Sequence, residues 1–273
     1  MMNLRFVSIV LLSFLAAPAA AVESHCIALS QAAPKVFYTG TETTKLAADE
    51  VRISYIGHST YLVETAGGIR SATDFTGFVG PDVVPDIVTM NRAHTSHFTE
   101  TPDPRIPHVL LGWGQDGKPA EHFLDLGELL VRNVTTDIRS RFGGPPEKDA
   151  NSIFIFEVAG LCIGHLGHLH HEPSEAQYAR IGRLDVVMAP VDGGMTLDLP
   201  TMIKVLKRLR ASLVLPMHWF GDGTLAVFLR GMQDEFVIER VGGKSIVVSL
   251  RNLPRRPTIR VLRQGFVGLD DLQ

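Results

Sequence analysis

Cysteine is scarce in this 273-residue sequence, which contains only Cys26 and Cys162. Two thiolates cannot supply the four ligands of a structural zinc site, so a metal site built on cysteine alone is excluded. Cys162 falls in a predicted buried strand and Cys26 in a polar N-terminal segment. A disulfide would suit an oxidising compartment, but nothing in the sequence positions the two cysteines together. We therefore expect both to be free, structural thiols.

Basic clusters and long hydrophobic runs are also absent. The net charge is −3 and no lysine or arginine run stands out, which argues against a nucleic-acid partner. The apolar run over residues 6–17 is shorter than the roughly 20 residues of a membrane-spanning helix. It follows Arg5 and precedes Ala19-Ala20-Ala21, an A-x-A cleavage site. We predict a signal peptide over residues 1–21, no stable membrane insertion after its cleavage, and a periplasmic or secreted protein; an uncleaved anchor is the alternative.

The sequence does contain enough apolar residues for a globular core, with 45% hydrophobic and 7% aromatic residues. Residues 22–50 are polar, alanine-rich and poorly periodic, and we expect an N-terminal arm or linker there. Clear alternation begins at Val51, and we predict one domain over residues 51–253. The basic residues 254–273 are expected to form a peripheral C-terminal tail. The oligomeric state is left open by the sequence.

Short strands separated by turn residues dominate the predicted domain. Residues 51–74 predict a three-stranded meander, because Gly57-His58-Ser59 and Gly67-Gly68 interrupt two alternating runs. Two helices are predicted, over residues 173–183 with Ser174 as the N-cap and over residues 200–209. Further strands are predicted within residues 86–90, 123–134, 151–163, 184–190, 213–217 and 245–250.

Histidine is concentrated where the predicted strands end. The segment Gly164–His171 reads G-H-L-G-H-L-H-H and follows one strand, His94 and His97 follow another, and His218 follows a third. The ends of neighbouring strands meet at one rim of a sheet, where functional sites form. Because neutral imidazole is the commonest protein ligand for zinc, this arrangement predicts a metal site at the rim. Solvated loop histidines are the alternative.

Several motifs between residues 51 and 219 resemble those of the metallo-β-lactamase superfamily, in its branch of lactonase-like and uncharacterised metal-dependent hydrolases. In chain order they are Y-I-G-H-S-T-Y-L-V-E (Tyr55–Glu64), T-D-F (Thr73–Phe75), N-R-A-H-T-S-H (Asn91–His97), the histidine-rich Gly164–His171 and L-P-M-H-W (Leu215–Trp219). The resemblance implies an α/β fold, a four-layer αββα sandwich, and hydrolysis of a small-molecule substrate with the help of a metal.

The metal-binding motifs depart from the pattern of that family at four positions. The first histidine of S/T-H-x-H-x-D-H is Arg92 here, and its aspartate is Ser96. The separate histidine expected between the two halves falls near Thr136, and the aspartate of H-L-G-D is His168. The two-metal centre of the family therefore cannot be carried over intact. One set of three imidazoles remains, which resembles the ligands of a single catalytic zinc with an open fourth position.

We predict that His97, His168 and His218 hold one metal ion, zinc or another divalent transition metal. A metal-bound hydroxide in such a site would attack an ester, a lactone or a phosphoester. His94 would join the ligands or hydrogen-bond the bound water. Arg92 would bind a substrate carboxylate or phosphate.

Further residues are predicted to surround this set. Asp74 would orient a ligand histidine from behind. The candidate shuttles or substrate contacts are His58, His170 and His171. The histidines expected to have structural, packing or surface roles are His165, His108 and His122. The loop Thr99–Pro119 is expected to line the substrate pocket, with Trp113 as a stacking or packing residue.

Two other functions compete with a metal hydrolase. The loss of family ligands could leave a metal-free or non-catalytic binding domain on the same fold. Three imidazoles also suit iron or copper, which would make a redox protein. The new imidazoles at His168 and His170, next to His97 and His218, favour the metal hydrolase.

Overall fold

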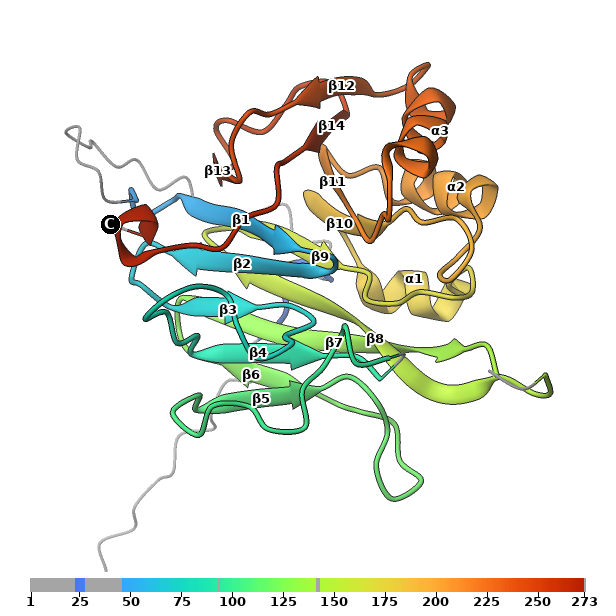
Figure 1. The fold of residues 1–273 in the computed structure, drawn as a ribbon, viewed down its shortest axis with the longest axis horizontal. Helices are drawn as coiled ribbons and strands as arrows, with labels where there is room; N and C mark the ends of the chain where they lie inside the picture. The colour runs from blue at the N-terminus through green and yellow to red at the C-terminus, as the bar shows by residue number, and fades with distance from the viewer. Residues whose placement is uncertain (1–22, 28–45, 93, 141–142, 273) are drawn as a thin grey trace, which may run out of the picture.

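The computed structural model describes residues 23–27, 46–92, 94–140 and 143–272. Two β-sheets pack face to face, and three α-helices cover the outer face of one of them (Figure 1). The predicted signal peptide over residues 1–21 lies outside the described residues. Within the described ranges, none of the helices is both long and apolar enough to cross a membrane.

The first sheet has six strands in the order β13-β1-β2-β3-β4-β5. Their bounds are β1 Val51–Gly57, β2 Thr60–Thr65, β3 Arg70–Ala72, β4 Ile87–Met90, β5 His108–Leu111 and β13 Ser245–Val248. Strands β1, β2 and β3 form the predicted antiparallel meander, whereas β3, β4 and β5 run parallel. Parallel pairing places the carboxyl ends of β3 and β4 at the same edge.

The second sheet has eight strands in the order β12-β14-β11-β10-β9-β8-β7-β6. Their bounds are β6 Phe123–Asp125, β7 Leu129–Ile138, β8 Glu147–Val158, β9 Leu161–His165, β10 Val186–Pro190, β11 Leu213–Met217, β12 Val237–Arg240 and β14 Thr258–Val261. Strands β6 to β9 are antiparallel neighbours, and β9, β10, β11, β14 and β12 are parallel. Helices follow β9, β10 and β11 in these parallel crossovers, whereas β12 reaches its parallel neighbour β14 through β13 of the other sheet.

Local sequence explains where the crossover helices begin. Helix α1 (Glu175–Ile181) starts at a capping box, in which Ser174 accepts from the backbone of Gln177 and the Gln177 side chain accepts from the backbone of Ser174. Helix α2 (Leu199–Leu209) starts at Asp198, whose side chain accepts from the backbone of Thr201. Helix α3 spans Asp222–Met232, and the sequence pattern did not predict it.

Apolar side chains form the core in layers. One cluster fills the space between the two sheets, and a second joins the eight-stranded sheet to the three helices. A third lies on the outer face of the six-stranded sheet, where loops and the 3-10 helix Leu269–Leu272 cover it. The predicted α/β sandwich is confirmed, and the described residues cover this last face with loops rather than with α-helices.

The C-terminal segment is not peripheral, contrary to the prediction. Strand β14 lies between β11 and β12 in the eight-stranded sheet, and Ile259 is fully buried in it. Val267 packs in the outer cluster of the six-stranded sheet, and its backbone pairs with Val79. The basic composition of residues 254–273 concealed a strand, because the strand is only four residues long and two of them, Thr258 and Arg260, are polar.

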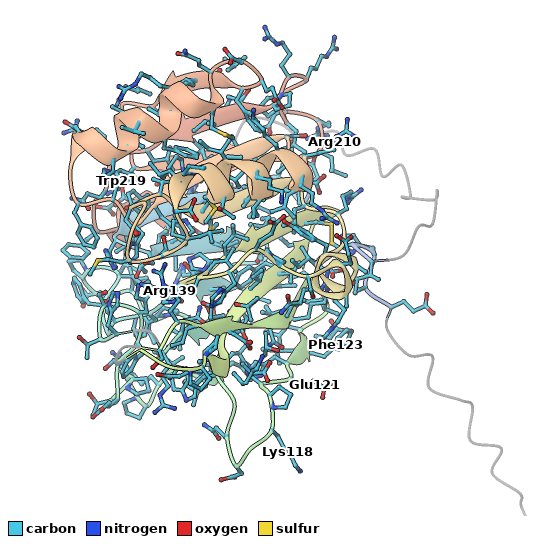
Figure 2. All side chains as sticks on the ribbon, turned by 90° about the vertical axis from the view of Figure 1, so that its right-hand side faces the viewer. Lys118, Glu121, Phe123, Arg139, Arg210 and Trp219 are labelled. Atoms are coloured by element: carbon cyan, nitrogen blue, oxygen red, sulfur yellow. A yellow bond between two sulfur atoms is a disulfide. The ribbon has the colours of Figure 1, made fainter. Side chains whose placement is uncertain are left out.

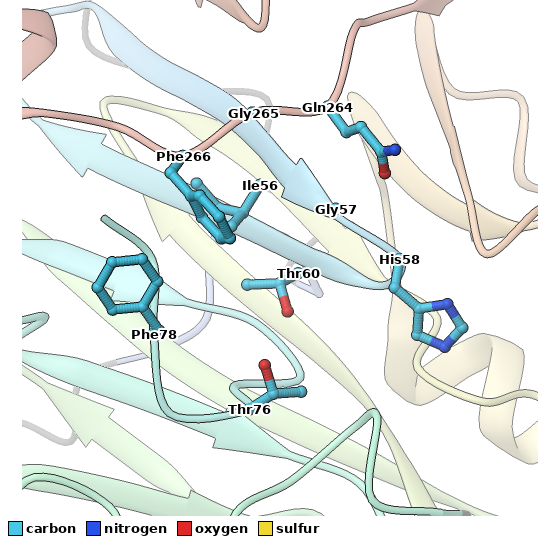
Figure 3. A pocket seen from close by; sticks show the side chains of 9 residues that line it. All are labelled: Ile56, Gly57, His58, Thr60, Thr76, Phe78, Gln264, Gly265 and Phe266. Atoms are coloured by element: carbon cyan, nitrogen blue, oxygen red, sulfur yellow. The ribbon is translucent and has the colours of Figure 1, made fainter. Parts of the chain in front are cut away.

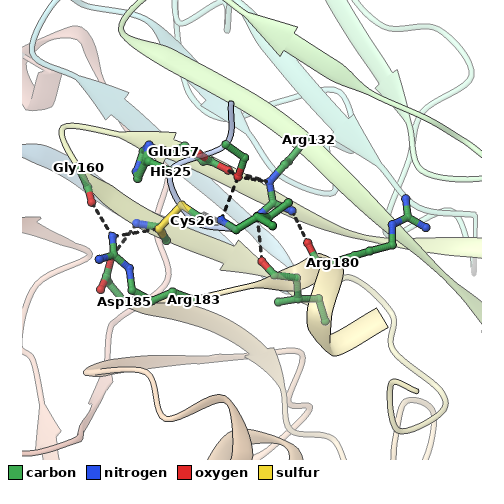
Figure 4. Close-up of a disulfide and its surroundings, with 12 residues drawn as sticks. His25, Cys26, Arg132, Glu157, Gly160, Arg180, Arg183 and Asp185 are labelled. Atoms are coloured by element: carbon green, nitrogen blue, oxygen red, sulfur yellow. Dashed lines mark hydrogen bonds and ion pairs between the residues drawn. A yellow bond between two sulfur atoms is a disulfide. The ribbon is translucent and has the colours of Figure 1, made fainter. Parts of the chain in front are cut away.

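The two cysteines form a disulfide, so the prediction of free thiols is wrong (Figure 4). Residues 23–27 lie against strands β8 and β9, where Ser24 donates to Glu157 at 2.5 Å. Arg132 donates to the same carboxylate at 2.7 Å and is buried with it. The pairing joins residues 136 positions apart, and such a contact arises from tertiary packing that no local pattern shows.

The carboxyl ends of six strands meet along one rim. Strands β1, β3 and β4 end there in the first sheet, and β9, β10 and β11 end there in the second. The backbone joins the sheets across this rim, because the amide of His218 donates to the carbonyl of His58 at 2.8 Å. Loops that follow these strands therefore come together, as the sequence predicted.

Candidate metal centre

Five imidazole rings gather at this rim. They come from the ends of four strands and are His58, His94, His97, His168 and His218. Ring centroids within the cluster lie as close as 4.1 Å, for His58 and His218. One candidate ligand nitrogen from each of His58, His94, His97 and His218 lies within 4.8 Å of the other three. The structure thus brings together the histidines of all three predicted strand ends.

Asp74 lies behind the ring of His97, one of the histidines that the sequence proposes as a metal ligand. One carboxylate oxygen of Asp74 lies 2.5 Å from Nδ1 of His97, and the other accepts from the Asn91 side chain at 2.8 Å. All three side chains are fully buried. Because Nδ1 of His97 donates to the carboxylate, its Nε2 keeps a free electron pair that faces the cluster.

His218 faces His97 from the opposite sheet. The two Nε2 atoms are 3.1 Å apart, and Nδ1 of His218 lies 3.6 Å from a carboxylate oxygen of Asp192. Among the described residues this Nδ1 has no hydrogen-bond partner within reach. Asp192 attracts a proton to Nδ1 of His218, so Nε2 of His218 carries an electron pair. This pair faces the Nε2 electron pair of His97. A cation between the two rings satisfies both, so this pair fits a metal ion.

A directed chain of hydrogen bonds sets the protons on the neighbouring rings. The backbone amide of Arg139 donates to Nδ1 of His170 at 2.8 Å, so neutral His170 carries its proton on Nε2. That nitrogen lies 2.6 Å from Nδ1 of His168, and Nε2 of His168 lies 3.0 Å from Nε2 of His94. His170 therefore donates to His168, and His168 donates to His94.

The series of hydrogen bonds continues through Ser96 to His58, on the far side of the cluster. The Ser96 hydroxyl lies 2.6 Å from Nδ1 of His94 and 2.8 Å from Nε2 of His58. With Nε2 of His94 accepting from His168, Nδ1 of His94 donates to Ser96, and Ser96 donates to His58. In this arrangement the electron pairs of His168 and His94 accept hydrogen bonds from His170 and His168, respectively, whereas His97 and His218 point theirs into the cluster.

Burial disfavours the charged form of three imidazoles in the cluster, His58, His97 and His168. It lowers the pKa of His58 to about 4, with the nearby His218 and His94 as further causes. Burial also lowers the pKa of His97 and His168 well below the ordinary histidine value, and the adjacent imidazoles add to the effect. Neutral rings are the form that binds metal ions.

The two carboxyl groups behind the cluster differ in pKa. Burial raises the pKa of Asp74 to about 6, although nearby His165 and the Asn91 hydrogen bond oppose it. Burial also acts to raise the pKa of Asp192, but His218 and the hydrogen bonds from Thr196 outweigh it and hold that pKa below its ordinary value. Asp192 thus stays charged behind His218.

Unusual backbone conformations occur at the site. His58, Asp74 and His218 have φ values of 51°, 40° and 55°. Residues other than glycine adopt this left-handed region at a cost and often at functional sites. The three turns direct these side chains inward from the ends of β1, β3 and β11.

Other predicted site residues lie away from the cluster centre. Arg92 is exposed and lines a separate cavity with His94 and Glu147. The ring of His171 is 6.5 Å from that of His170, and its buried Nε2 has no partner among the described residues. His165 is buried and bonds the Ser59 carbonyl at 2.8 Å, which agrees with a structural role.

The remaining histidines and the predicted pocket loop fall outside the cluster. His122 bonds the Leu111 carbonyl and His108 lies in β5. Trp113 packs against Phe98 with ring centroids 5.8 Å apart and lines a different cavity. Figure 2 shows the loop with Lys118 projecting away from the two sheets. Most of the predicted pocket loop is therefore remote from the imidazoles.

Sequence reasoning missed four polar residues that support the cluster. Asn91 braces Asp74 and also accepts from the Ser152 amide at 2.7 Å. Asn151 accepts from the backbone amide of His168 at 2.7 Å. The other two are Ser96 and Asp192. A lone serine or asparagine has no distinctive local pattern, although the turn after β10 could have drawn attention to Asp192.

Comparison of the sequence with models of protein families shows which family this chain belongs to. The model of the beta-lactamase superfamily domain matches residues 52–218, which span every member of the histidine cluster. The chain belongs to the metallo-β-lactamase superfamily. The resemblance seen in the sequence motifs is thereby confirmed.

Curated relatives of this superfamily member are named metal-dependent hydrolases, the class of enzyme that the sequence predicted. A UPF0173 metal-dependent hydrolase from Carboxydothermus hydrogenoformans is 24% identical over 208 residues, covering 68% of this chain and 92% of the relative. One of the same name from Methanosphaerula palustris is 25% identical over 186 residues, covering 62% and 84%.

Solved structures share the fold. A protein from Thermotoga maritima, described as a Zn-dependent hydrolase of the metallo-beta-lactamase superfamily, matches with a TM-score of 0.56 and 24% identity, covering 78% of this chain and 98% of the other. A protein from Parabacteroides distasonis, described as a metal-dependent hydrolase, matches with a TM-score of 0.53 and 13% identity, covering 78% and 93%. At these identities the likeness shows the fold alone.

Proposed function

We propose that this protein is an exported, metal-dependent hydrolase of a small molecule with an ester, lactone or phosphoester bond. The observation that carries the proposal is the facing pair of His97 and His218, whose Nε2 atoms are 3.1 Å apart while an aspartate lies behind each ring. Carboxylates behind metal-binding histidines orient the rings and raise their affinity for the metal. The names of the curated relatives support the same class of enzyme.

Zinc is the metal we propose, because a site of neutral imidazoles suits it. His97 and His218 are two of its ligands. His94 and His168 are the two candidates for the third. The placement of the nitrogens favours His94, because one of its ring nitrogens lies within 4.8 Å of a ring nitrogen of both His97 and His218. Coordination through Nε2 of His94 displaces the hydrogen bond that this atom accepts from His168. The ligand set predicted from the sequence includes His168 instead. For His168 to coordinate through Nε2, its proton has to move to Nδ1 and its hydrogen bond with His170 has to reverse.

The side chains around the proposed metal have separate tasks. A bound divalent metal polarises the scissile group and lowers the pKa of water. Asp74 and Asp192 hold the His97 and His218 rings in place. His168 presents a proton on Nε2 toward the cluster. The Ser96 hydroxyl accepts from His94 and donates to His58, and so links the two rings. His58 stands at the edge of the cluster, next to a cavity that can receive the substrate.

The proposed export rests on two features. A disulfide persists in oxidising compartments and is rare in the cytosol, and Cys26 and Cys162 are paired here. The N-terminal sequence has the charged start, apolar run and A-x-A site of a signal peptide. Expression with detection of the mature N-terminus by mass spectrometry tests this point. Cleavage near residue 21 is the expected result, and an intact cytosolic chain with reduced cysteines would refute export.

Hydrolysis of a substrate panel tests the proposed activity. Purified protein is assayed on esters, lactones and phosphoesters before and after a chelator removes metal, and again after zinc is restored. We expect activity on at least one class that is lost with the metal and regained with zinc. The matched variants His94→Ala and His168→Ala are compared for zinc affinity by competition with a chromophoric chelator. The larger loss identifies the third ligand, and we expect it in His94→Ala.

A further inference from the structure

A cavity of about 430 Å³ opens directly beside the histidine cluster (Figure 3). His58 lies at one end of it, and the phenyl rings of Phe78 and Phe266 lie at the other. The volume is within the range of small-molecule binding sites. Because His58 belongs both to the cavity wall and to the cluster, a molecule bound in the cavity lies next to the proposed reaction centre.

The wall of this cavity is uncharged, and its aromatic end is formed by Phe78 and Phe266, with the neutral polar side chains of Thr60, Thr76 and Gln264 beside them. None of the described residues that line it is Asp, Glu, Lys or Arg. Phe78 and Phe266 meet edge to face with centroids 4.9 Å apart, yet they remain 49% and 58% exposed. Two phenyl rings that contact each other and still face solvent offer an apolar surface that a flat group can cover.

Exposed phenylalanine is concentrated on this side of the molecule. Across the described residues, four phenylalanines are strongly exposed, namely Phe78, Phe123, Phe220 and Phe266. Phe220 lies next to the cluster, with its centroid 5.5 Å from that of His58 and 5.3 Å from that of His218. Two of the four therefore line the cavity, and a third lies against the histidine that joins the cavity to the cluster. Scattered exposed apolar residues are ordinary, but a group around a cavity mouth marks a binding site.

The cavity on the other side of the cluster has the opposite character. It measures about 530 Å³, and His94 lies in its wall together with Arg92, Glu100 and Glu147. Ser96 joins the two sides, since its hydroxyl bonds both His58 and His94. The cluster thus lies between an aromatic cavity and a charged one.

We propose that the substrate carries an aryl group that packs against the exposed faces of Phe78 and Phe266, with its scissile bond at the histidine cluster and its polar end toward Arg92. The inference rests on the proposed hydrolase function and adds the class of substrate. Aromatic rings pair favourably with phenyl side chains beyond the area they bury, and the absence of charge from the lining residues disfavours an ionic group at that end. An aryl-substituted ester or lactone fits this division.

Equilibrium binding of two inert anions tests the inference apart from catalysis. Phenylacetate and acetate are titrated into the full mature protein and followed by calorimetry. We expect phenylacetate to bind at least about tenfold more tightly than acetate, because only it fills the aromatic cavity. The preference should disappear in the double variant Phe78→Ala/Phe266→Ala. Phe123→Ala, an exposed phenylalanine on β6 outside the cavity, is the matched control and should retain it.

The outcomes separate this inference from the proposed activity. Equal affinity for the two anions in the wild type, no binding of either, or a preference that survives in the double variant would overturn the aryl pocket. Loss of the preference in Phe123→Ala would do the same. His218→Ala should abolish hydrolysis and keep the phenyl preference. A wild-type protein that prefers phenylacetate but hydrolyses nothing would leave the aryl pocket standing and refute the hydrolase.

Discussion

At the scale of single residues, the site depends on the groups behind the imidazoles. Asp74 lies 2.5 Å from His97 and is itself held by Asn91. The motif around Asp74 was enough to predict that it orients a histidine. Its bond to Asn91 and the link from Ser96 to two rings could not be predicted, because each joins residues on separate loops whose approach depends on the fold.

Replacement of Asp74 by Asn should weaken metal binding. The amide cannot hold Nδ1 of His97 as a carboxylate does, and loss of such partners lowers metal affinity by about 10–100-fold. Zinc affinity measured by chelator competition checks this. Asp125→Asn, at an exposed carboxylate that accepts from the Gly127 amide, removes the same charge as a control and should leave the affinity unchanged. Equal affinity in Asp74→Asn would contradict the role of Asp74.

The low pKa of His58 predicts a pH effect on the stability of the metal-free protein. Its pKa is about 4 when folded and about 6.5 when unfolded. Between these values the unfolded chain binds more protons, so this group lowers the free energy of unfolding as pH falls, by at most about 1.4 kcal/mol per pH unit. Asp74, with its pKa raised to about 6 in the folded protein, has the opposite effect: below that pH it raises the free energy of unfolding as pH falls, because the folded state binds its proton first.

Comparison with a variant isolates the contribution of His58. Urea unfolding at about pH 7 and about pH 5 should show a smaller loss of stability for His58→Gln than for the wild type. His108→Gln, on strand β5 outside the cluster, should lose as much as the wild type. An identical loss for His58→Gln and the wild type would show that His58 does not titrate in this way.

At the scale of elements, periodicity and turn residues predicted what is local. The meander, the strand pair β8 and β9, and helices α1 and α2 all follow from alternation, glycine turns and N-caps. Strand β14 was missed because its place in the sheet is decided by its parallel neighbours β11 and β12. The disulfide was missed for a similar reason.

Strand β14 should be necessary for a stable fold. Ile259 is fully buried in the cluster between the sheet and the helices, and truncation of such a residue to alanine costs about 2–5 kcal/mol. Arg260 pairs with Glu239 at the surface, and Arg260→Ala should cost only about 0–1 kcal/mol. Urea denaturation measures both. A peripheral tail would instead make the two substitutions equally mild.

Reduction of the Cys26–Cys162 disulfide should destabilise the protein by about 2–5 kcal/mol, because it closes a long loop and limits the unfolded chain. The midpoint of urea unfolding should fall when dithiothreitol is added. In the double variant Cys26→Ser/Cys162→Ser the midpoint should already be low and should not respond to dithiothreitol. A wild-type midpoint that is the same with and without reductant would contradict the stabilising role.

At the scale of the whole molecule, the sequence predicted the sandwich, the family and the strand ends that carry the site. The order of strands within each sheet, and the face on which the helices lie, came only from the structure. The same holds for the two cavities on either side of the cluster, because their walls combine loops that are far apart in sequence. Residues 264–266 in one wall belong to the segment that the sequence predicted to be peripheral.

The central claim is that the histidine cluster binds one divalent metal ion. Its most direct test is the metal content of the purified protein after reconstitution with zinc and removal of unbound metal, measured by elemental analysis. The account predicts about one zinc per chain in the wild type and in the control His108→Ala, and a loss of zinc in His218→Ala. No metal in the wild type, or the same amount in His218→Ala, would contradict it.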